Sequence, residues 1–314
     1  MISVDDFVPL FEREVGRPPR RGEILGRHAN FRIGGPADLF FEAADRDELV
    51  RAVLIARRSG MRFAVIGGGF NLLFDDAGYR GLIIKNAARG VAVRASRAVI
   101  EAASGTSLGD VVALAAENGL GGLEFLAGIP GTVGGAVYGN AGAFGRAAGD
   151  FLEEAVLLDA EGAEIRSGRG DFEFAYRHSR LKKSRDVVLG AEFRLTPAAP
   201  GQIRAKIEDY LSLRARRHPP QSTAYPGSYF KNPVLPDGCR QAAGLLLQEA
   251  GARGLRVGAA AVYAGHCNFI INEGGAAARD VRALADELKK RVRDRFGIDL
   301  EEEVIFLEAA SPGF

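Results

Sequence analysis

The sequence contains few of the residues that mark secreted, metal-binding or membrane proteins. Only two of its 314 residues are cysteines, Cys239 and Cys267, which is too few for the disulfide framework of a small secreted domain. Its four histidines are scattered and no CxxC or HExxH motif occurs, so we expect no metal site. No stretch approaches the roughly 18 consecutive apolar residues of a transmembrane helix. We therefore expect no membrane span.

Neither sign of charge is in excess. Lys and Arg total 41 and Asp and Glu total 40, a formal net charge of +1. This balance argues against a nucleic-acid partner, although a few basic side chains are enough to bind an anionic small molecule. The first residues, Met1–Asp6, lack the basic and then apolar pattern of a signal peptide. We expect a cytoplasmic protein with no obligate protein partner.

Glycine is the residue type present in excess. There are 41 glycines in the chain, roughly twice the usual share of ~7%. They cluster between strand and helix signals instead of forming a periodic or linker-like tract. Some of the backbone must therefore turn tightly or approach another group closely.

The pattern of apolar residues predicts an α+β protein whose strands occur in groups. Predicted strands cover residues 38–43, 63–66, 81–85, 153–159, 163–167, 187–195, 255–263, 267–272 and 303–307, with a further strand or hairpin in 91–103. Predicted helices run from the N-cap Asp45 to Gly60, from the N-cap Ser107 to Glu117, over 202–217, near 240–251 and over 277–296. Residues 196–201 favour a linker. This order predicts two units before residue 196 and one after it.

The first candidate site is the loop Gly67-Gly68-Gly69-Phe70-Asn71. It follows a buried strand, and a glycine run there exposes several backbone N–H groups that suit a pyrophosphate. A Rossmann fingerprint needs a third glycine and a following helix, but Leu72 and another apolar run follow here. A tight structural turn explains the loop equally well.

The second candidate site is the segment 119–145, which holds ten glycines and one charged residue, Glu124. Close packing of strands explains three or four glycines but hardly ten. We therefore expect this backbone to pack against a large planar or phosphorylated ligand.

Three shorter segments carry polar groups, and each also has a plain structural explanation. Arg177 in Tyr176–Ser179 has the planar fork that binds a carboxylate, although most such arginines lie on the surface. Ser228 follows a glycine, but the segment lacks the GxSxG pattern of a serine hydrolase and is also typical of a turn. Glu301 and Glu303 share one face of an extended chain, where acidic clusters are usually solvated.

The order of these segments is more specific than any one of them. The series FRIGGPAD, GGGFN, GLEFLAGIPGTVGGAV, NAGAFG, YRHS, GSYFKNP, AGLLLQEAG, HCNFIIN and LEEEV resembles the UDP-N-acetylenolpyruvoylglucosamine reductase (MurB) family from about residue 25 to 308. The spacing is similar to the shorter type of that family, which has no inserted tyrosine-bearing loop after the YRxS segment.

The resemblance implies a fold and a reaction. The fold is the FAD-binding fold of the vanillyl-alcohol-oxidase type, in two subdomains at 1–85 and 86–201, followed by an α+β substrate domain at 202–314. The cofactor is noncovalent FAD, which NADPH reduces and which then delivers a hydride to UDP-N-acetylglucosamine enolpyruvate. The product is UDP-N-acetylmuramate, a precursor of peptidoglycan.

The resemblance also assigns roles to residues. Arg177 and Glu303 match the groups that stabilise the developing negative charge on the substrate, and Ser228 matches the proton donor to its α-carbon. The residues that match the FAD site are Gly67, Gly68, Gly69, Phe70, Asn71, Gly128, Ile129, Pro130, Gly131, Thr132, Gly134, Gly135 and Asn140. Expected contacts to the substrate or the nicotinamide nucleotide are Tyr176, Arg216, Lys231 and Asn232.

The chain departs from the family pattern at several positions. Phe70 stands where the family usually has Ser, which removes one hydroxyl donor to the FAD pyrophosphate. Gly139, the pair Ala224-Tyr225 and Gly265 also differ from the usual residues. Two other functions therefore stay open: an oxidase of the same fold, and a nucleotide-sugar binding protein without flavin. The visible spectrum of the purified protein separates the second of these from an enzyme.

Overall fold

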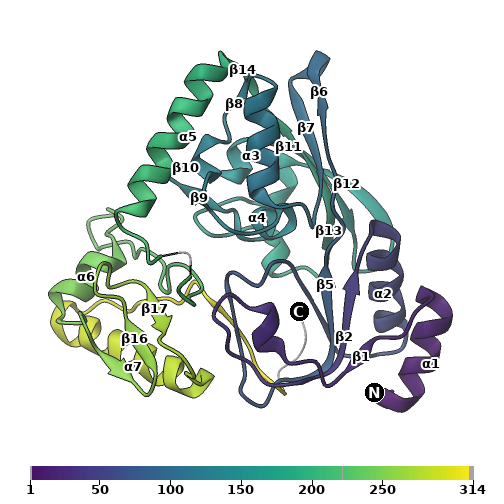
Figure 1. Ribbon diagram of the computed structural model, residues 1–314, viewed down its shortest axis with the longest axis horizontal. Coiled ribbons are helices and arrows are strands. Elements are labelled where there is room, and N and C mark those ends of the chain that lie inside the picture. The colour runs from purple at the N-terminus through teal and green to yellow at the C-terminus, as the bar shows by residue number, and fades with distance from the viewer. Residues whose placement is uncertain (1, 221, 311–314) are drawn as a thin grey trace.

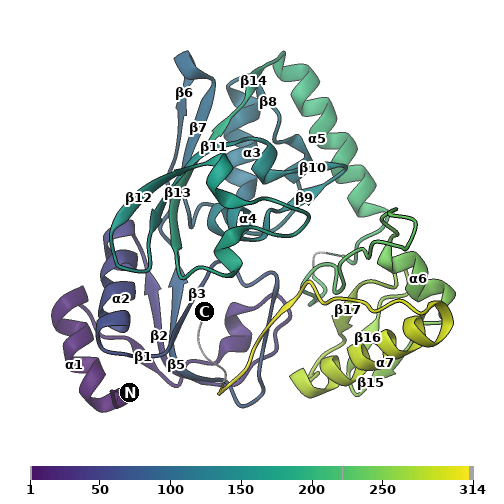
Figure 2. The ribbon, with the colours of Figure 1, turned by 180° about the vertical axis from the view of Figure 1, so that it is seen from behind.

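The computed structural model describes residues 2–220 and 222–310 and confirms the α+β class. Two sheets with their covering helices form the larger part of the molecule, and a smaller sheet with two helices lies beside them (Figure 1). The yellow C-terminal segment runs back from the smaller part to the first sheet (Figures 1 and 2). In the described ranges, no helix combines the length and the apolar character needed to cross a membrane.

The first sheet has the strand order β1-β2-β5-β3. Its strands are β1 (Arg20–Arg21), β2 (Ala37–Ala43), β5 (Tyr79–Asn86) and β3 (Phe63–Ile66), with β2, β5 and β3 parallel. The helices α1 (Val4–Val15) and α2 (Arg46–Arg58) pack beside it. Asp45 caps α2 as predicted, because its carboxylate accepts the amide of Glu48 at 2.8 Å. Helix α1 was not predicted from the sequence.

The second sheet is antiparallel throughout and has the order β12-β11-β13-β7-β6. Its strands are β12 (Glu164–Gly168), β11 (Leu152–Leu158), β13 (Val187–Arg194), β7 (Val99–Ala103) and β6 (Val91–Arg94). The helices α3 (Leu108–Glu117) and α4 (Val133–Gly139) share its largest apolar core. Ser107 caps α3 as predicted.

The predicted linker at 196–201 is wrong. Residues Thr196–Pro197 form strand β14, which pairs with β8 (Leu120–Gly121), and α5 (Pro200–Ala215) begins directly afterwards. Pro200 fits the first turn of a helix, where its missing N–H would have no helical partner. A proline that suggested a break in the chain therefore begins a helix instead.

The third part contains β15 (Arg256–Val257), β16 (Ala260–Val262) and β17 (Ile270–Asn272) with the helices α6 (Ala243–Glu249) and α7 (Ala278–Phe296). Its strands are shorter than predicted. The predicted apolar face of α7 is confirmed: Val281, Leu284, Ala285, Leu288 and Val292 are all fully buried.

The last strand joins this third part to the first. β18 (Ile305–Leu307) pairs in parallel with β4 (Leu72–Phe74), directly after the loop 67–71. A small hairpin, β9 (Gly142–Ala143) and β10 (Arg146–Ala147), completes the described strands. The division at residues 85 and 201 stays a prediction.

Asp76 makes a second link between the first and third parts. Its two carboxylate oxygens accept the amides of Ala278 at 2.7 Å and Arg279 at 3.1 Å, at the start of α7. The helix's own N-cap residue, Ala277, has no side chain that could accept these bonds. A carboxylate from another part of the chain therefore caps this helix.

We predict that Asp76→Ala lowers the free energy of unfolding by about 1–2 kcal/mol, the usual value of a lost N-cap. Urea denaturation of the FAD-loaded protein measures this change. Asp47→Ala is the control, because Asp47 is exposed in the first turn of α2 and its carboxylate bonds to no other described residue; its loss should cost less than about 0.5 kcal/mol. Equal effects of the two substitutions would contradict the capping role.

Candidate active site

The two predicted glycine loops lie against each other. A Cβ atom on Gly67 would lie 2.5 Å from Oγ1 of Thr132, closer than real contacts allow. Gly69 has a φ of +71°, and a Cβ there would lie 1.9 Å from the carbonyl oxygen of His28. The absence of side chains therefore lets the loop after β3 pass between the segment around Thr132 and the segment around His28.

Several backbone amides on these loops are unpaired. On the first loop the amides of Gly68, Gly69 and Phe70, and on the second those of Gly128, Gly131 and Thr132, donate to no other described residue. Backbone amides that are shielded from water usually have a partner, and five of these six residues are buried or half-buried, Gly128 being exposed. Two such groups of amides on abutting loops suit an anion with several oxygens.

Other predicted cofactor residues have their polar groups already bonded. The amide of Ile129 donates to Leu126 and that of Gly134 to Ser104, at 2.9 and 2.8 Å. Gly135 donates weakly to Oγ1 of Thr132, which caps α4. The amides of these three residues are therefore not available to a ligand, and their bonds shape the second loop. Pro130 has no amide hydrogen to donate.

Asn140 connects the glycine-rich segment to the segment that carries Arg177. Its φ of +46° ends α4 in the left-handed conformation. The side chain is 6% exposed, donates to the carbonyl of Ala175 at 2.8 Å and accepts the amide of Gly149 at 2.9 Å. Its amide group is therefore occupied by the protein.

Phe70 lies where the family usually has a serine. Its ring folds back over Gly68, since a Cβ on Gly68 would lie 2.5 Å from the ring. The amides of both residues stay unpaired within the described chain. The hydroxyl donor is lost, but the backbone donors of the loop remain.

Arg177 occupies a strained turn. Ala175 and His178 exchange two backbone hydrogen bonds of 3.1 Å, with Tyr176 and Arg177 between them. Arg177 has a φ of +54°, a conformation that costs a non-glycine residue about 1–2 kcal/mol. Such strain persists where the surrounding structure holds the residue in place, and it is concentrated at functional sites.

The strained turn directs the Arg177 side chain toward Glu303. Nη1 donates to the carbonyl of Gly142 at 2.8 Å, and Nε lies 2.5 Å from Oε1 of Glu303. The Nε–H bond does not point along this contact, so the buried Nε has no well-directed hydrogen bond. Nη2 donates to no other described residue, so the guanidinium keeps donor capacity for another acceptor.

Burial raises the pKa of Glu303 above its ordinary value. The positive charges of Arg177, Lys182 and Lys231 oppose this effect only in part. The side chain is 16% exposed. A carboxyl group in such surroundings is protonated at higher pH than usual and can then donate a hydrogen bond.

The three consecutive glutamates have different partners. Glu301 pairs with Lys231 and Glu303 with Arg177, whereas Glu302 pairs with Lys289. The predicted alternation of faces is confirmed, although the strand begins only at Ile305.

The backbone places Ser228 beside the segment of Glu303. Tyr229, the next residue, accepts the amide of Glu303 on its carbonyl at 2.8 Å. Asn268 holds the same segment, because its side chain accepts the amide of Phe230 and donates to the carbonyl of Phe230. The Ser228 hydroxyl is partly exposed and bonds to no other described residue.

A cavity of about 1000 Å³ lies beside Tyr176 and Glu301, which neighbour Arg177 and Glu303 in the chain; Arg177, Ser228 and Glu303 themselves do not line it. Tyr176, Lys231, Asn232, Arg240 and Glu301 are among the residues that line it. The hydroxyl of Tyr176 accepts the amide of Asn232 at 3.2 Å, and the Arg240 guanidinium lies 4.0 Å from the centre of the Tyr176 ring. Three of the four residues predicted to contact substrate therefore line one cavity.

Arg216, the fourth, lies elsewhere. Its side chain is exposed at the end of α5 and has no partner among the described residues. Arg214, which the sequence analysis missed, instead donates to the carbonyls of Ala127 and Phe125 at 2.9 and 3.1 Å. Helical position decides which of the two arginines faces the glycine-rich segment.

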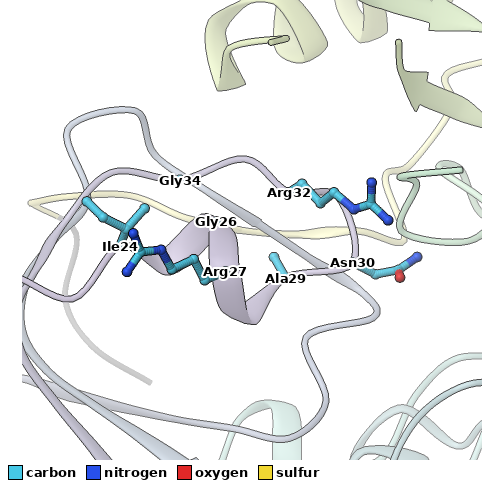
Figure 3. Close-up of a pocket in the computed structure, with 7 residues that line it drawn as sticks. All are labelled: Ile24, Gly26, Arg27, Ala29, Asn30, Arg32 and Gly34. Atoms are coloured by element: carbon cyan, nitrogen blue, oxygen red, sulfur yellow. The ribbon is translucent and has the colours of Figure 1, made fainter. Parts of the chain in front are cut away.

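A second cavity, of about 570 Å³, lies along residues 24–34, and none of the predicted site residues lines it (Figure 3). Arg27 and Arg32 point in opposite directions there. Asn30 and Arg32 donate to the carbonyls of Tyr225 and Ser222. This region joins the first part of the chain to the third.

Lys182 is a further residue that the sequence analysis missed. Its Nζ donates to the carbonyl of Arg177 at 2.8 Å, and burial, followed by the charge of Lys231, lowers its pKa. No motif indicated it, although it follows Arg177 by only five positions. Within residues 2–220 and 222–310, no group of three or more His, Cys, Asp or Glu side chains suits a metal ion.

The chain is similar to known proteins over most of its length. A model of the FAD binding domain matches residues 37–168, and a model of the UDP-N-acetylenolpyruvoylglucosamine reductase C-terminal domain matches residues 219–307. The chain is 43% identical over 295 residues to a UDP-N-acetylenolpyruvoylglucosamine reductase of Geobacter metallireducens, covering 92% of this chain and 95% of that protein. A second relative, the UDP-N-acetylenolpyruvoylglucosamine reductase of Geobacter sulfurreducens, is 40% identical over 304 residues, which cover 96% of this chain and 97% of that protein.

A solved structure agrees with this match. The crystal structure of the reductase MurB from Thermus caldophilus superposes with a TM-score of 0.74 at 32% identity, and covers 92% of this chain and 98% of that one. The unpaired amides on the two abutting loops fit the pyrophosphate of FAD, so the geometry agrees with the matched FAD-binding domain.

We predict that Gly69→Ala weakens FAD binding by about tenfold or more. The left-handed strain alone corresponds to about 1–2 kcal/mol, and the added methyl group also collides with the His28 carbonyl. Titration of the apoprotein with FAD, followed by flavin fluorescence, measures the effect.

Gly60→Ala is the matched control. Gly60 also has a positive φ, of +62°, but nothing lies within 4 Å of the added Cβ. This variant should lose about 1 kcal/mol of stability and bind FAD as the unmodified protein does. Wild-type FAD affinity in Gly69→Ala would show that the loop does not hold the cofactor.

Proposed function

We propose a role for each residue of this site from one premise: the chain belongs to the UDP-N-acetylenolpyruvoylglucosamine reductase family. It is therefore an FAD-binding oxidoreductase of peptidoglycan precursor synthesis, with NADPH as its cosubstrate. When bound, FAD would carry a hydride from NADPH to the enolpyruvyl group of the UDP-sugar. The contact between Arg177 and Glu303 carries the proposal for the residues.

Arg177 and Glu303 stabilise the negative charge that develops on the substrate. Addition of a hydride to the β-carbon leaves charge on the α-carbon, which spreads into the adjoining carboxylate. The Arg177 fork has donor capacity left for a carboxylate oxygen, and Glu303, when protonated, donates a hydrogen bond to the same group. One donor of this kind is worth about 3–4 kcal/mol in the transition state.

Ser228 donates the proton to the α-carbon. Its hydroxyl has no bond to another described residue, so it is available to the substrate. The backbone bonds of Tyr229 and Phe230 fix the segment that carries it. A hydroxyl is a weak acid, and it can act here only where a carbanion forms beside it.

The cavity lined by Tyr176, Lys231 and Asn232 receives the UDP-sugar or the nicotinamide nucleotide. Lys231 supports this proposal by its charge, which suits a phosphate oxygen. Arg216 stays a proposed contact at the exposed end of α5. On the other side, the loops 67–71 and 128–135 hold FAD through their unpaired amides, with Asn140 fixing the second loop.

We also propose three broader features. The chain is of the shorter type of the family and acts in the cytoplasm. Its FAD-binding part comprises subdomains 1–85 and 86–201, and its substrate domain comprises 202–314. The positions of the first two sheets and of the smaller third sheet in the chain support this division.

We predict that Ser228→Ala still allows NADPH to bleach the flavin but slows reduction of the enolpyruvyl sugar by at least about 10²-fold, the lower end for a lost general acid. Stopped-flow absorbance measures each half-reaction separately. Ser212→Ala, an exposed serine on α5, is the control and should leave both rates unchanged. Equal losses in the two half-reactions would contradict the role of Ser228 as proton donor.

We predict that the rate of sugar reduction falls as the pH rises through the elevated pKa of Glu303. The protonated form donates the hydrogen bond, and it is present below that pKa and lost above it. Glu303→Gln keeps a neutral donor and should lack this decrease, although its rate at low pH is reduced. If the rate of Glu303→Gln falls over the same pH range as the rate of the unmodified protein, another group is responsible for the titration.

A further inference from the structure

We propose that Lys182 is a positioning residue, which holds Arg177 in its strained turn and adjusts the charge around Glu303. The inference rests on the proposed roles of Arg177 and Glu303 and extends them. Lys182 lies outside the segments on which the resemblance rests, and its contact with the Arg177 carbonyl points to its role.

The position of Lys182 is itself fixed. It ends η6 (Arg180–Lys182), which follows the buried Ser179. The Ser179 hydroxyl donates to the carbonyl of Tyr138 at 2.7 Å, and the Lys182 ammonium lies 5.9 Å from the centre of the Tyr138 ring. The lysine is therefore held half-buried against α4, with its ammonium beside the turn.

The Arg177 carbonyl has no other donor among the described residues. The carbonyl of a left-handed residue points away from the regular pairing of its neighbours. Among the described residues, the backbone hydrogen bonds that close the turn are the two between Ala175 and His178. The Lys182 ammonium bonds to the carbonyl at 2.8 Å and so fixes the peptide that follows Arg177. Without this bond the turn can relax, and relaxation rotates the guanidinium away from Glu303.

The ammonium also acts on Glu303 through its charge. The groups around Glu303 are Arg177, Lys182 and Lys231, and each lowers the pKa that burial raises. Lys182 is in turn affected by Glu303, Glu301, Lys231 and Arg177, so these five residues form one charged group. Loss of the Lys182 charge leaves the burial of Glu303 less opposed, and the pKa of Glu303 rises further.

The decisive variant is Lys182→Met, which keeps most of the length of the side chain and removes both the donor and the charge. Lys183→Met is the matched control, because Lys183 is exposed and its ammonium bonds to no other described residue. Both variants are loaded with FAD. The measurements are the two half-reactions by stopped flow, with NADPH and then the UDP-enolpyruvyl sugar, and the pH dependence of the second.

We expect Lys182→Met to slow the second half-reaction by about 10²-fold, as a small misplacement of a catalytic group does. Flavin reduction by NADPH should change by less than about threefold. A loss of folded protein would lower both half-reactions alike, so it cannot produce this difference. The decrease of the second rate at high pH should move to higher pH, because the protonated form of Glu303 persists longer. Lys183→Met should match the unmodified protein in all three measurements.

A chemical rescue separates position from folding. Lys182→Cys in a Cys239→Ser background leaves Cys267, which is buried, as the other thiol. Alkylation of the introduced thiol by bromoethylamine rebuilds an ammonium at nearly the lysine length, and should restore the second half-reaction at least tenfold, about 1.4 kcal/mol. Equal losses in both half-reactions of Lys182→Met, an unmoved pH profile or a failed rescue would each overturn the inference. Failure of the unmodified protein and of Lys183→Met to reduce the sugar would instead overturn the proposed function.

Discussion

The contact between Arg177 and Glu303 is the interaction on which the arrangement of the site depends. Burial favours the neutral form of the glutamate, and the guanidinium beside it favours the charged form. The result is a carboxyl group whose pKa is raised while it stays in contact with Arg177. Such a pair can meet a substrate carboxylate with donors from both side chains as charge accumulates there. The strain in the Arg177 turn is the cost of holding the guanidinium in this place.

The C-terminal segment links this pair to the cofactor loop. Asn71, at the end of the loop 67–71, donates its side-chain amide to the carbonyl of Glu303 at 3.0 Å and accepts the amide of Ile305 on its own carbonyl. The following residues then form β18 beside β4. The loop whose unpaired amides are proposed to bind the FAD pyrophosphate is therefore bonded directly to a residue proposed for catalysis. Glu303 in turn bonds to Tyr229, next to Ser228. The stretch around Glu303 thus joins the loop 67–71 to the segment that carries Ser228, the proposed proton donor.

Local signals predicted much of the fold, and contacts distant in sequence explain what they missed. Asp45 predicted the start of α2 because capping depends on neighbouring residues alone. The helix α4 was missed because glycines disfavour helices; it forms where Gly134 bonds to Ser104 and packs closely against it. Motifs and resemblance identified Arg177, and the structure places it against Glu303. Lys182 could not be predicted, because the contact on which its proposed role rests arises from a fold that returns it to the Arg177 carbonyl.

The most direct test of this account is a double-mutant cycle on the second half-reaction with Arg177→Met, Glu303→Gln and the double variant, each loaded with FAD and reduced by NADPH. If the two side chains act as one unit on the substrate carboxylate, the double variant should be about as slow as the slower single variant. Flavin reduction by NADPH should continue in all three. Losses that add in free energy would show that the two groups act independently and would contradict the central claim.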